Sequence, residues 1–258
     1  MPNHSNKPHL ILGANGRLVN ANLLEAYTPP VAQGPGHVPV HPFELYTKLR
    51  SELDYNQWGV EEEFLAMDDD KHSQIMMFHI EDRIEGRYFG TEAKLTLAII
   101  NNNLKKAKVL GFSGVQEMVC MNHQADGIAK IADKHTKTIM ARAFDKIEKW
   151  IHRLRKEMVI KTSRRGHLKN YILNESTAHD WLVQASEQNI LPITRLLDAR
   201  DEWKQPTESH NARDGSAFLF SQAVNRVIAT TPTNLLVKSN RLSAFLDEKT
   251  HFDAPEVL

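Results

Sequence analysis

The sequence predicts an α+β fold. We expect a mostly antiparallel sheet of four or five strands, packed by one long amphipathic helix and followed by a helical carboxyl-terminal half. Three observations support this class. Residues 92–100 alternate in the manner of a β-strand, residues 136–158 repeat apolar side chains every three or four positions, and residues 178–246 contain only shorter helical patterns.

The sheet is expected to be an antiparallel meander preceded by a helix. Pro42 suits the first turn of that helix, because an N–H at this position would have no helical partner. Gly111 and Gly114 mark positions of a bulge or of close backbone approach. The strands are expected at 60–67, 74–80, 92–100 and 109–121.

The long helix carries one apolar stripe, which predicts packing across a whole face of the sheet. The stripe consists of Met140, Ala143, Phe144, Ile147, Trp150, Ile151, Leu154 and Met158. The outer flank of the same helix carries the cations Arg142, Lys146, Lys149, Arg153 and Lys156. A basic break is expected at 162–166, and shorter helices are expected at 178–187, 192–203, 216–229 and 234–246.

These patterns divide the chain into three parts. Residues 1–40, rich in Pro and Gly, are expected to form an extended leader that lies on the domain or exchanges with a neighbouring subunit. Residues 41–170 are expected to form the α+β core with the sheet and the long basic helix. Residues 171–258 are expected to form a helical part packed on that core.

Charge is distributed unevenly along a chain whose formal net charge is zero. Residues 134–169 contain 12 Lys or Arg against 3 Asp or Glu, a net charge of +9, so the rest of the chain carries −9. Such asymmetry is typical of a binding face, and it is equally typical of a solvated helix beside an acidic sheet.

The binding interpretation predicts a nucleic-acid surface on the long helix, where cations neutralise phosphates and Tyr88 or Phe89 stacks on bases. The cations expected to contact phosphates are Lys134, Lys137, Arg142, Lys146, Lys149, Arg153, Arg164 and Arg165.

A second candidate site is a polar cluster at the strand ends and at the start of the long helix. It consists of Asn101, Asn103, Asn122, His123 and His135. Helix amino termini beside strand ends are common anion sites, whereas a turn followed by a capped helix explains the same residues without any ligand. Asn101, Asn103, His123 and His135 also leave open a small-molecule or metal-dependent enzyme.

Other motifs are weak. Val19 stands where a dinucleotide-binding turn needs its third glycine, Pro39 separates His37 from His41, and Cys120 lies in an apolar run. We therefore predict no catalytic residue, no metal and no cofactor. Because the chain has a single cysteine, no apolar run long enough to span a bilayer and no apolar signal core, we expect a cytoplasmic protein.

Four motifs resemble the DUF932 family of phage and plasmid proteins in order and spacing. They are Val119-Cys-Met-Asn122, Lys134-His-Thr-Lys137, Glu202-Trp-Lys-Gln-Pro206 and Gln222-Ala-Val-Asn-Arg226. The resemblance covers roughly residues 35–250 and implies a mobile-element setting, with host cytoplasm as the location, rather than a reaction. The chain departs from the family at Asn101-Asn-Asn-Leu104, where Asn-Ser-His-Asp is frequent.

Charge, resemblance and element order together predict a phage- or plasmid-encoded protein that binds or anneals single-stranded DNA as a homo-oligomer. The order of helix, strand meander and long helix is also similar to the core of single-strand annealing proteins. Two alternatives stay open: an interaction module that inhibits a host defence factor, and the enzyme described above.

Overall fold

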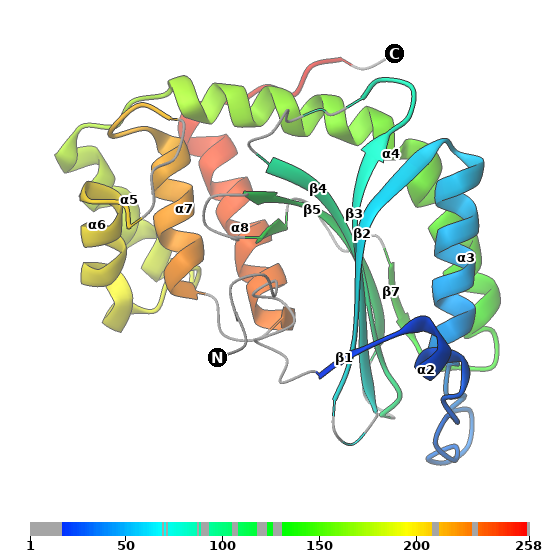
Figure 1. The fold of residues 1–258 in the computed structure, drawn as a ribbon. Helices are drawn as coiled ribbons and strands as arrows, with labels where there is room; N and C mark the ends of the chain where they lie inside the picture. The colour runs from blue at the N-terminus through cyan, green and yellow to red at the C-terminus, as the bar shows by residue number, and fades with distance from the viewer. Residues whose placement is uncertain are drawn as a thin grey trace, which may run out of the picture.

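The computed structural model has the predicted α+β architecture, with one antiparallel sheet between two groups of helices (Figure 1). It describes residues 17–68, 70, 72–86, 88, 93–104, 108–117, 123–125, 131–207, 212–228 and 232–256.

Within the described residues, the sheet has seven strands in the order β1-β2-β3-β4-β5-β6, and β7 also pairs with β5. The strands are β1 (Arg17–Val19), β2 (Trp58–Met67), β3 (Ser73–Asp82), β4 (Ala93–Asn102), β5 (Lys108–Glu117), β6 (His123–Ala125) and β7 (Ile131–Lys134). Every pair is antiparallel. The expected count of four or five strands was too low, because β1, β6 and β7 are only three or four residues long, too short for an alternating pattern to stand out in the sequence.

The strand pairing tests the prediction of a bulge or a close backbone approach at Gly111 and Gly114. The register of β4 with β5 is continuous through Gly111 and Gly114, and the irregularity of the sheet lies instead in β2, between Val60 and Glu62. Close approach is confirmed at Gly111, where a Cβ atom would come within 2.9 Å of the Ile131 side chain. Glycine is therefore required there for β7 to pack beside β5.

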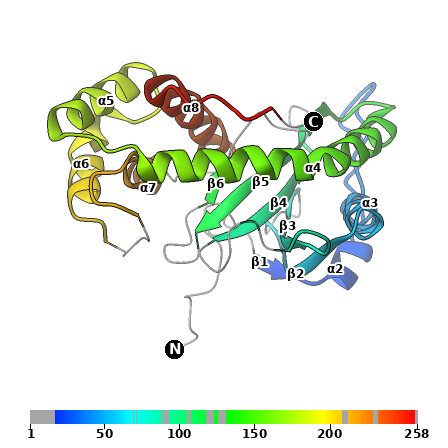
Figure 2. The same ribbon diagram turned by 90° about the horizontal axis from the view of Figure 1, so that it is seen from above.

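The helices are α2 (Ala21–Glu25), α3 (Pro42–Tyr55), α4 (Ile139–Asn170), α5 (Glu175–Glu187), α6 (Leu196–Lys204), α7 (Ala217–Ile228) and α8 (Pro232–Thr250), with a 3₁₀ turn η2 (Ile193–Arg195). Seen from above, α4 runs over one end of the sheet, from the side of α3 to the side of α5, α6, α7 and α8 (Figure 2).

Both faces of the sheet are buried. Alternate residues of β4, such as Leu95 and Leu97, pack with α2, α3 and the first two thirds of α4 in one core cluster. Their neighbours Ala98 and Ile100 pack with Leu168 and the carboxyl-terminal helices in the other cluster. The alternation of β4 therefore divides its side chains between two cores.

The described part of the expected leader, residues 17–40, contains β1 and α2 and is not uniformly extended. Leu24, Tyr27 and Val40 are at most 7% exposed and belong to the core cluster under α3. This segment is therefore part of the core of the chain that carries it.

Candidate nucleic-acid interface

Helix α4 is the element that positions most of the predicted phosphate-binding cations. Its apolar stripe is confirmed, because Ala143, Ile147, Ile151 and Leu154 are all buried against the sheet. The expected break at 162–166 is wrong: α4 continues through Gly166 to Asn170. Tertiary packing outweighs the low helix propensity of glycine here, since Leu168 is buried among the carboxyl-terminal helices.

Two of the predicted cations are committed to fastening the start of α4. Arg142 Nε lies 3.3 Å and Lys146 Nζ 2.8 Å from carboxylate oxygens of Asp133, at the end of β7. The Arg142 guanidinium also donates to the Lys134 carbonyl oxygen at 3.2 Å and to Thr136 Oγ1 at 3.0 Å. These contacts hold β7 and the first turn of α4 together.

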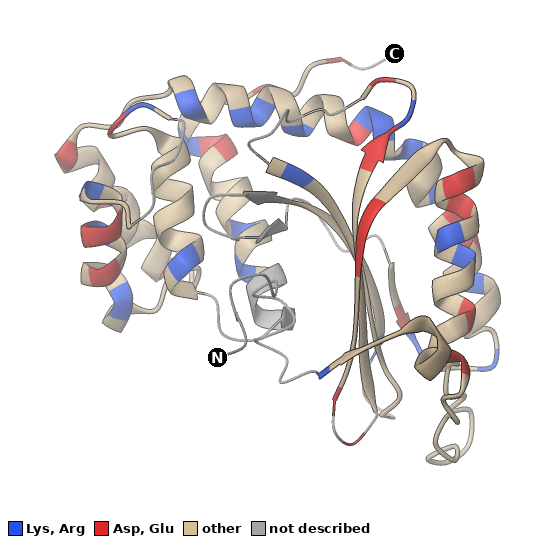
Figure 3. Ribbon diagram, viewed as in Figure 1, with Lys and Arg blue, Asp and Glu red and all other residues tan. Residues whose placement is uncertain are grey.

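The outward-facing cations are Lys134, Lys137, Lys149 and Arg153, all of which are exposed. Lys149 forms an exposed ion pair with Asp145 at 2.7 Å, which contributes little to stability and leaves its ammonium accessible to solvent. The path from residue 137 to residue 153 is roughly 24 Å at 1.5 Å per residue. Figure 3 shows Lys and Arg distributed along α4, whereas Asp and Glu gather on α3 and near the ends of β2 and β3.

The last two predicted cations, Arg164 and Arg165, lie in a different environment. Arg164 is paired with Asp247 of α8, and its guanidinium carbon is 5.7 Å from the centre of the Phe252 ring. The Arg165 guanidinium lies 5.1 Å from the centre of the Phe218 ring on α7. These two side chains therefore join α4 to the carboxyl-terminal helices.

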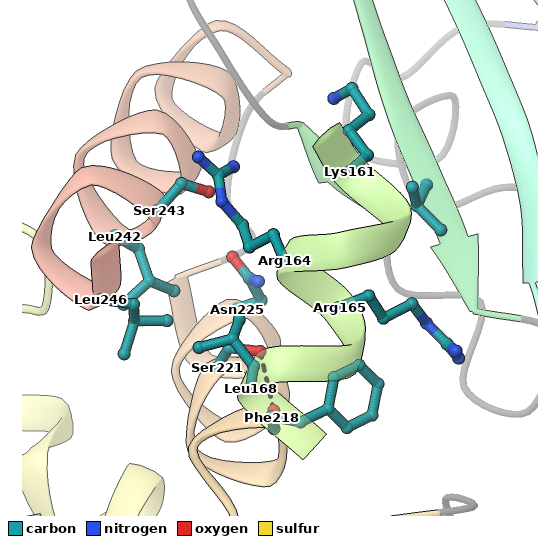
Figure 4. Close-up of a pocket in the computed structure, with 11 residues that line it drawn as sticks. Lys161, Arg164, Arg165, Leu168, Phe218, Ser221, Asn225, Leu242, Ser243 and Leu246 are labelled. Carbon is teal, nitrogen blue, oxygen red and sulfur yellow. Dashed lines mark hydrogen bonds between the residues drawn. The ribbon is translucent and has the colours of Figure 1, made fainter. Parts of the chain in front are cut away.

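A small pocket, partly open to solvent, lies at this junction. In Figure 4, Arg164 extends between the helices toward Asn225 and Ser243, and the ammonium group of Lys161 points away from the strand drawn beside it. Lys161 is only 7% exposed. The pocket is lined by Val115, Lys161, Arg164, Arg165, Leu168, Phe218, Ser221, Asn225, Leu242, Ser243 and Leu246.

Apart from Arg164 and Arg165, the polar lining of this pocket was missed by the sequence analysis. Its signal was the presence of Ser221 and Asn225, with the neighbouring Gln222, on α7, whose other side chains are largely apolar. All three are at most 5% exposed, and Ser239 Oγ of α8 donates to Asn225 Oδ1 at 2.9 Å. Buried polar groups at helical spacing indicate a polar interior rather than a fully apolar helix contact.

Six of the eight predicted cations lie on α4, and Lys134 and Lys137 lie just before it. Their side chains nevertheless contact different parts of the protein. Lys146 and Arg164 are 18 positions apart, roughly 27 Å along the helix. The first contacts β7, and the second contacts α8. The accessible part of the predicted surface is the outer flank of α4 that carries Lys149 and Arg153.

The second predicted site, the polar cluster, is partly assembled and deeply buried. Asn122 and the side chain of His123 lie outside the described residues. Asn101 and Asn103 are fully buried and both contact the backbone of Val40. Asn103 Oδ1 accepts from the Val40 N–H at 2.7 Å, while Asn103 Nδ2 donates to the Val40 carbonyl at 3.0 Å and to the Tyr27 hydroxyl at 3.2 Å. Asn103 therefore pairs with Val40 much as a neighbouring strand would.

His135 holds the same segment two residues earlier, at Val38; Asn103 and His135 together are called the clamp. The ring Nδ1 of His135 donates to the Val38 carbonyl at 3.3 Å, and its own carbonyl accepts from the Val38 N–H at 3.2 Å. The His37 ring lies 5.7 Å away, centre to centre, and its Nδ1 accepts from the Gln33 N–H at 3.0 Å. The Nε2 atoms of both rings are buried.

The His135 ring makes stability dependent on pH. Burial lowers the pKa of His135 below its ordinary value of 6.5, and the neighbouring His37 lowers it further. The folded state therefore binds fewer protons than the unfolded state below pH 6.5. The contribution of the His135 ring to stability is fully present above pH 6.5 and is lost as the pH falls through the folded pKa.

We expect urea titrations of the protein to show the free energy of unfolding falling below pH 6.5, by at most about 1.4 kcal/mol per pH unit from this ring. His135→Gln should flatten that part of the pH profile. His152→Gln, at an exposed position of α4, is the control and should keep the wild-type profile. An unchanged profile in His135→Gln would contradict the assignment.

A third group of polar residues fastens the middle of α4 to the sheet. Arg155 Nε and Nη2 donate to the two carboxylate oxygens of Asp82, at 2.7 and 3.0 Å, and Nη2 also donates to the Asn56 carbonyl at 2.7 Å. The Tyr88 hydroxyl donates to Asp82 at 2.9 Å, and its ring packs beside Trp58. Tyr88, which was expected to stack on bases, is therefore committed to this network; Phe89 lies outside the described residues.

Searches for relatives found no matching family model, no matching curated protein and no matching solved structure. In the part of the chain that the structure describes, no helix is long and apolar enough to cross a membrane. Nor do three His, Cys, Asp or Glu side chains of the described residues lie close enough together to hold a metal ion.

Proposed function

We propose that the protein binds nucleic acid, with single-stranded DNA as the preferred form, through the outer flank of α4. The observation that supports this best is the arrangement of its cations on one 32-residue helix. Lys149, Arg153 and Lys156 follow one another at intervals of four and three residues, which places them along a single flank. They continue the line of Arg142 and Lys146, which are paired with Asp133. The resemblance to phage and plasmid proteins is consistent with such a role and stays a prediction.

An exposed aromatic side chain beside α4 provides a base-stacking surface. Tyr55, the last residue of α3, is 82% exposed. Its neighbour Asn56 accepts a hydrogen bond from Arg155 of α4, so Tyr55 lies near the middle of this helix, on the side of Arg155 rather than on the flank of Lys149 and Arg153. Proteins that bind single strands combine such aromatic platforms with cations that follow the backbone. We propose Tyr55 as a stacking residue in place of Tyr88, which is bonded to Asp82; the prediction for Phe89 stays a prediction.

Binding of a fluorescently labelled 30-nucleotide oligothymidine, measured by anisotropy across a salt series, tests the proposal. We expect micromolar or tighter binding at low salt. With about four phosphate contacts, the plot of log affinity against log salt should have a slope of about −3, since each contact to a single strand contributes about −0.7. Duplex DNA and single-stranded RNA of the same length establish the preferred form. Absence of binding at 50 mM salt would overturn the proposal.

A double variant locates the surface. Lys149→Glu with Arg153→Glu should weaken binding by at least tenfold and reduce the salt slope, because two phosphate contacts become repulsive. The matched control is Arg195→Glu with Arg200→Glu in the α6 region, where each arginine is likewise paired with an aspartate, Asp198 at 3.0 Å and Asp201 at 2.7 Å. Equal loss in the two variants would show that only the net charge of the protein matters.

A further inference from the structure

An apolar groove lies in the helical half of the chain, away from the outer flank of α4. It is bordered by the end of α5, by η2 and the turn before it, by the first residue of α6 and by α8, and it is open to solvent. Its apolar lining is Val183, Leu191, Pro192, Ile193 and Leu196. Figure 2 shows α5 and α6 beyond the carboxyl-terminal end of α4, at the far end of the molecule from α3.

Exposed apolar side chains concentrate around this groove. Ile193 is 74% exposed and Val183 is 48% exposed, and both line it. Leu197 and Val237 are 62% and 47% exposed, and each is adjacent in sequence to a residue of the groove. These four are a third of the twelve large apolar side chains that are exposed in the described part of the chain. Exposed apolar side chains gathered at a groove are typical of a surface that a protein covers.

The charges at the groove favour a second copy of the chain as that protein. Glu187 at the end of α5 and Lys238 on α8 both line the groove, so the same surface offers one carboxylate and one ammonium. In a dimer with a two-fold axis, each residue meets its complement on the other subunit. Glu187 of each copy would then face Lys238 of the other, which gives two equivalent ion pairs. Ile193, which lines the groove, and the adjacent Leu197 would pack against the same surface of the partner.

We propose that two copies of this chain associate through the groove about a two-fold axis. The interface is built from α5, η2, α6 and α8. Lys149 and Arg153 lie outside it, so both copies of α4 keep their outward cations exposed. The proposal does not depend on nucleic-acid binding, because it rests on apolar exposure and on the charges at the groove.

Sedimentation velocity of the full chain between 1 and 200 µM is the test. We expect a dimer that dissociates on dilution. Ile193→Asp and Leu197→Asp should each weaken self-association by at least tenfold. Ile84→Asp is the matched control, because Ile84 is 65% exposed in the turn after β3, outside the groove, and this variant should dimerise like the wild type.

Exchanging the charges of Glu187 and Lys238 distinguishes a specific interface from a general loss of folding. Glu187→Lys alone should weaken the dimer, because it places like charges opposite each other, and Glu187→Lys combined with Lys238→Glu should restore it. A protein that stays monomeric at 200 µM would overturn the proposal, as would a dimer insensitive to Ile193→Asp. Oligomer size is measured without DNA, so a dimer that fails to bind oligothymidine would contradict the proposed function alone.

Discussion

Asp82→Ala is expected to lower the free energy of unfolding by about 3 kcal/mol, because it removes one partner of a buried ion pair. The Asp82 side chain is fully buried, and it accepts hydrogen bonds from Arg155, from the Tyr88 hydroxyl and from the Ile84 N–H. The substitution leaves those three donors without their acceptor. The loss is placed at the lower end of the range for buried pairs, because the Arg155 side chain is 34% exposed and gains some hydration.

The pKa of Asp82 also indicates that its ionised side chain stabilises the folded state. Burial alone would raise the pKa of this carboxyl group, but the hydrogen bonds from Arg155, Ile84 and Tyr88 outweigh burial and lower it below 3.8. The folded state therefore favours the ionised form. This contribution to stability is present above pH 3.8 and is lost as the pH falls through the folded pKa.

Urea unfolding monitored by tryptophan fluorescence measures the effect, and Trp58 is well placed as a probe because the Arg155 guanidinium lies 5.1 Å from its ring. The control is Asp145→Ala, which breaks the exposed pair with Lys149 and should cost no more than about 0.5 kcal/mol. If the two variants lost equal stability, the hydrogen bonds of Asp82 with Arg155 and Tyr88 would not contribute appreciably to holding α4 on the sheet.

Asn103→Ala is expected to cost about 2 to 3 kcal/mol and to loosen residues 17–40 from the core. The Asn103 amide bonds both the N–H and the carbonyl of Val40, which is fully buried. Without that amide the Val40 N–H loses its acceptor in a site that water does not reach. We expect faster proteolysis within residues 28–36 together with the loss of stability.

Asn102→Ala is the matched control for this prediction. Asn102 is a neighbouring asparagine that is only partly buried, and it bonds Ser73 Oγ and the N–H of the exposed Leu104, both at 2.9 Å. Because water replaces these contacts, its loss should cost less than about 1 kcal/mol. If residues 28–36 were cleaved equally slowly in Asn103→Ala and in the wild type, Asn103 would not hold this segment to the core.

Most of the fold was predictable because it follows from local periodicity. The alternation in β4 and the apolar stripe of α4 each repeat several times within one element, so a single irregular residue does not obscure them. The short strands were not predictable in this way. β7 has four residues, and it is defined by its pairing with β5 rather than by a pattern of its own.

The candidate sites were less predictable, because a side chain's type does not reveal its partner. Arg142 and Lys149 look alike in sequence, yet Asp133 engages the first, whereas the second forms only an exposed pair with Asp145. Asn101 and Asn103 suggested an anion site at the strand ends. In the structure they hold the backbone of Val40, more than 60 positions earlier in the chain.

The sequence by itself determined the fold class, the location of the principal strands and helices, and the concentration of positive charge between residues 134 and 169. Only the tertiary structure decided that α4 continues through Gly166, that Arg155 is anchored by Asp82, and that the accessible cations are those of the outer flank. The physical reason is that periodicity arises from neighbours within one turn or strand, whereas these outcomes depend on contacts between residues far apart in the sequence.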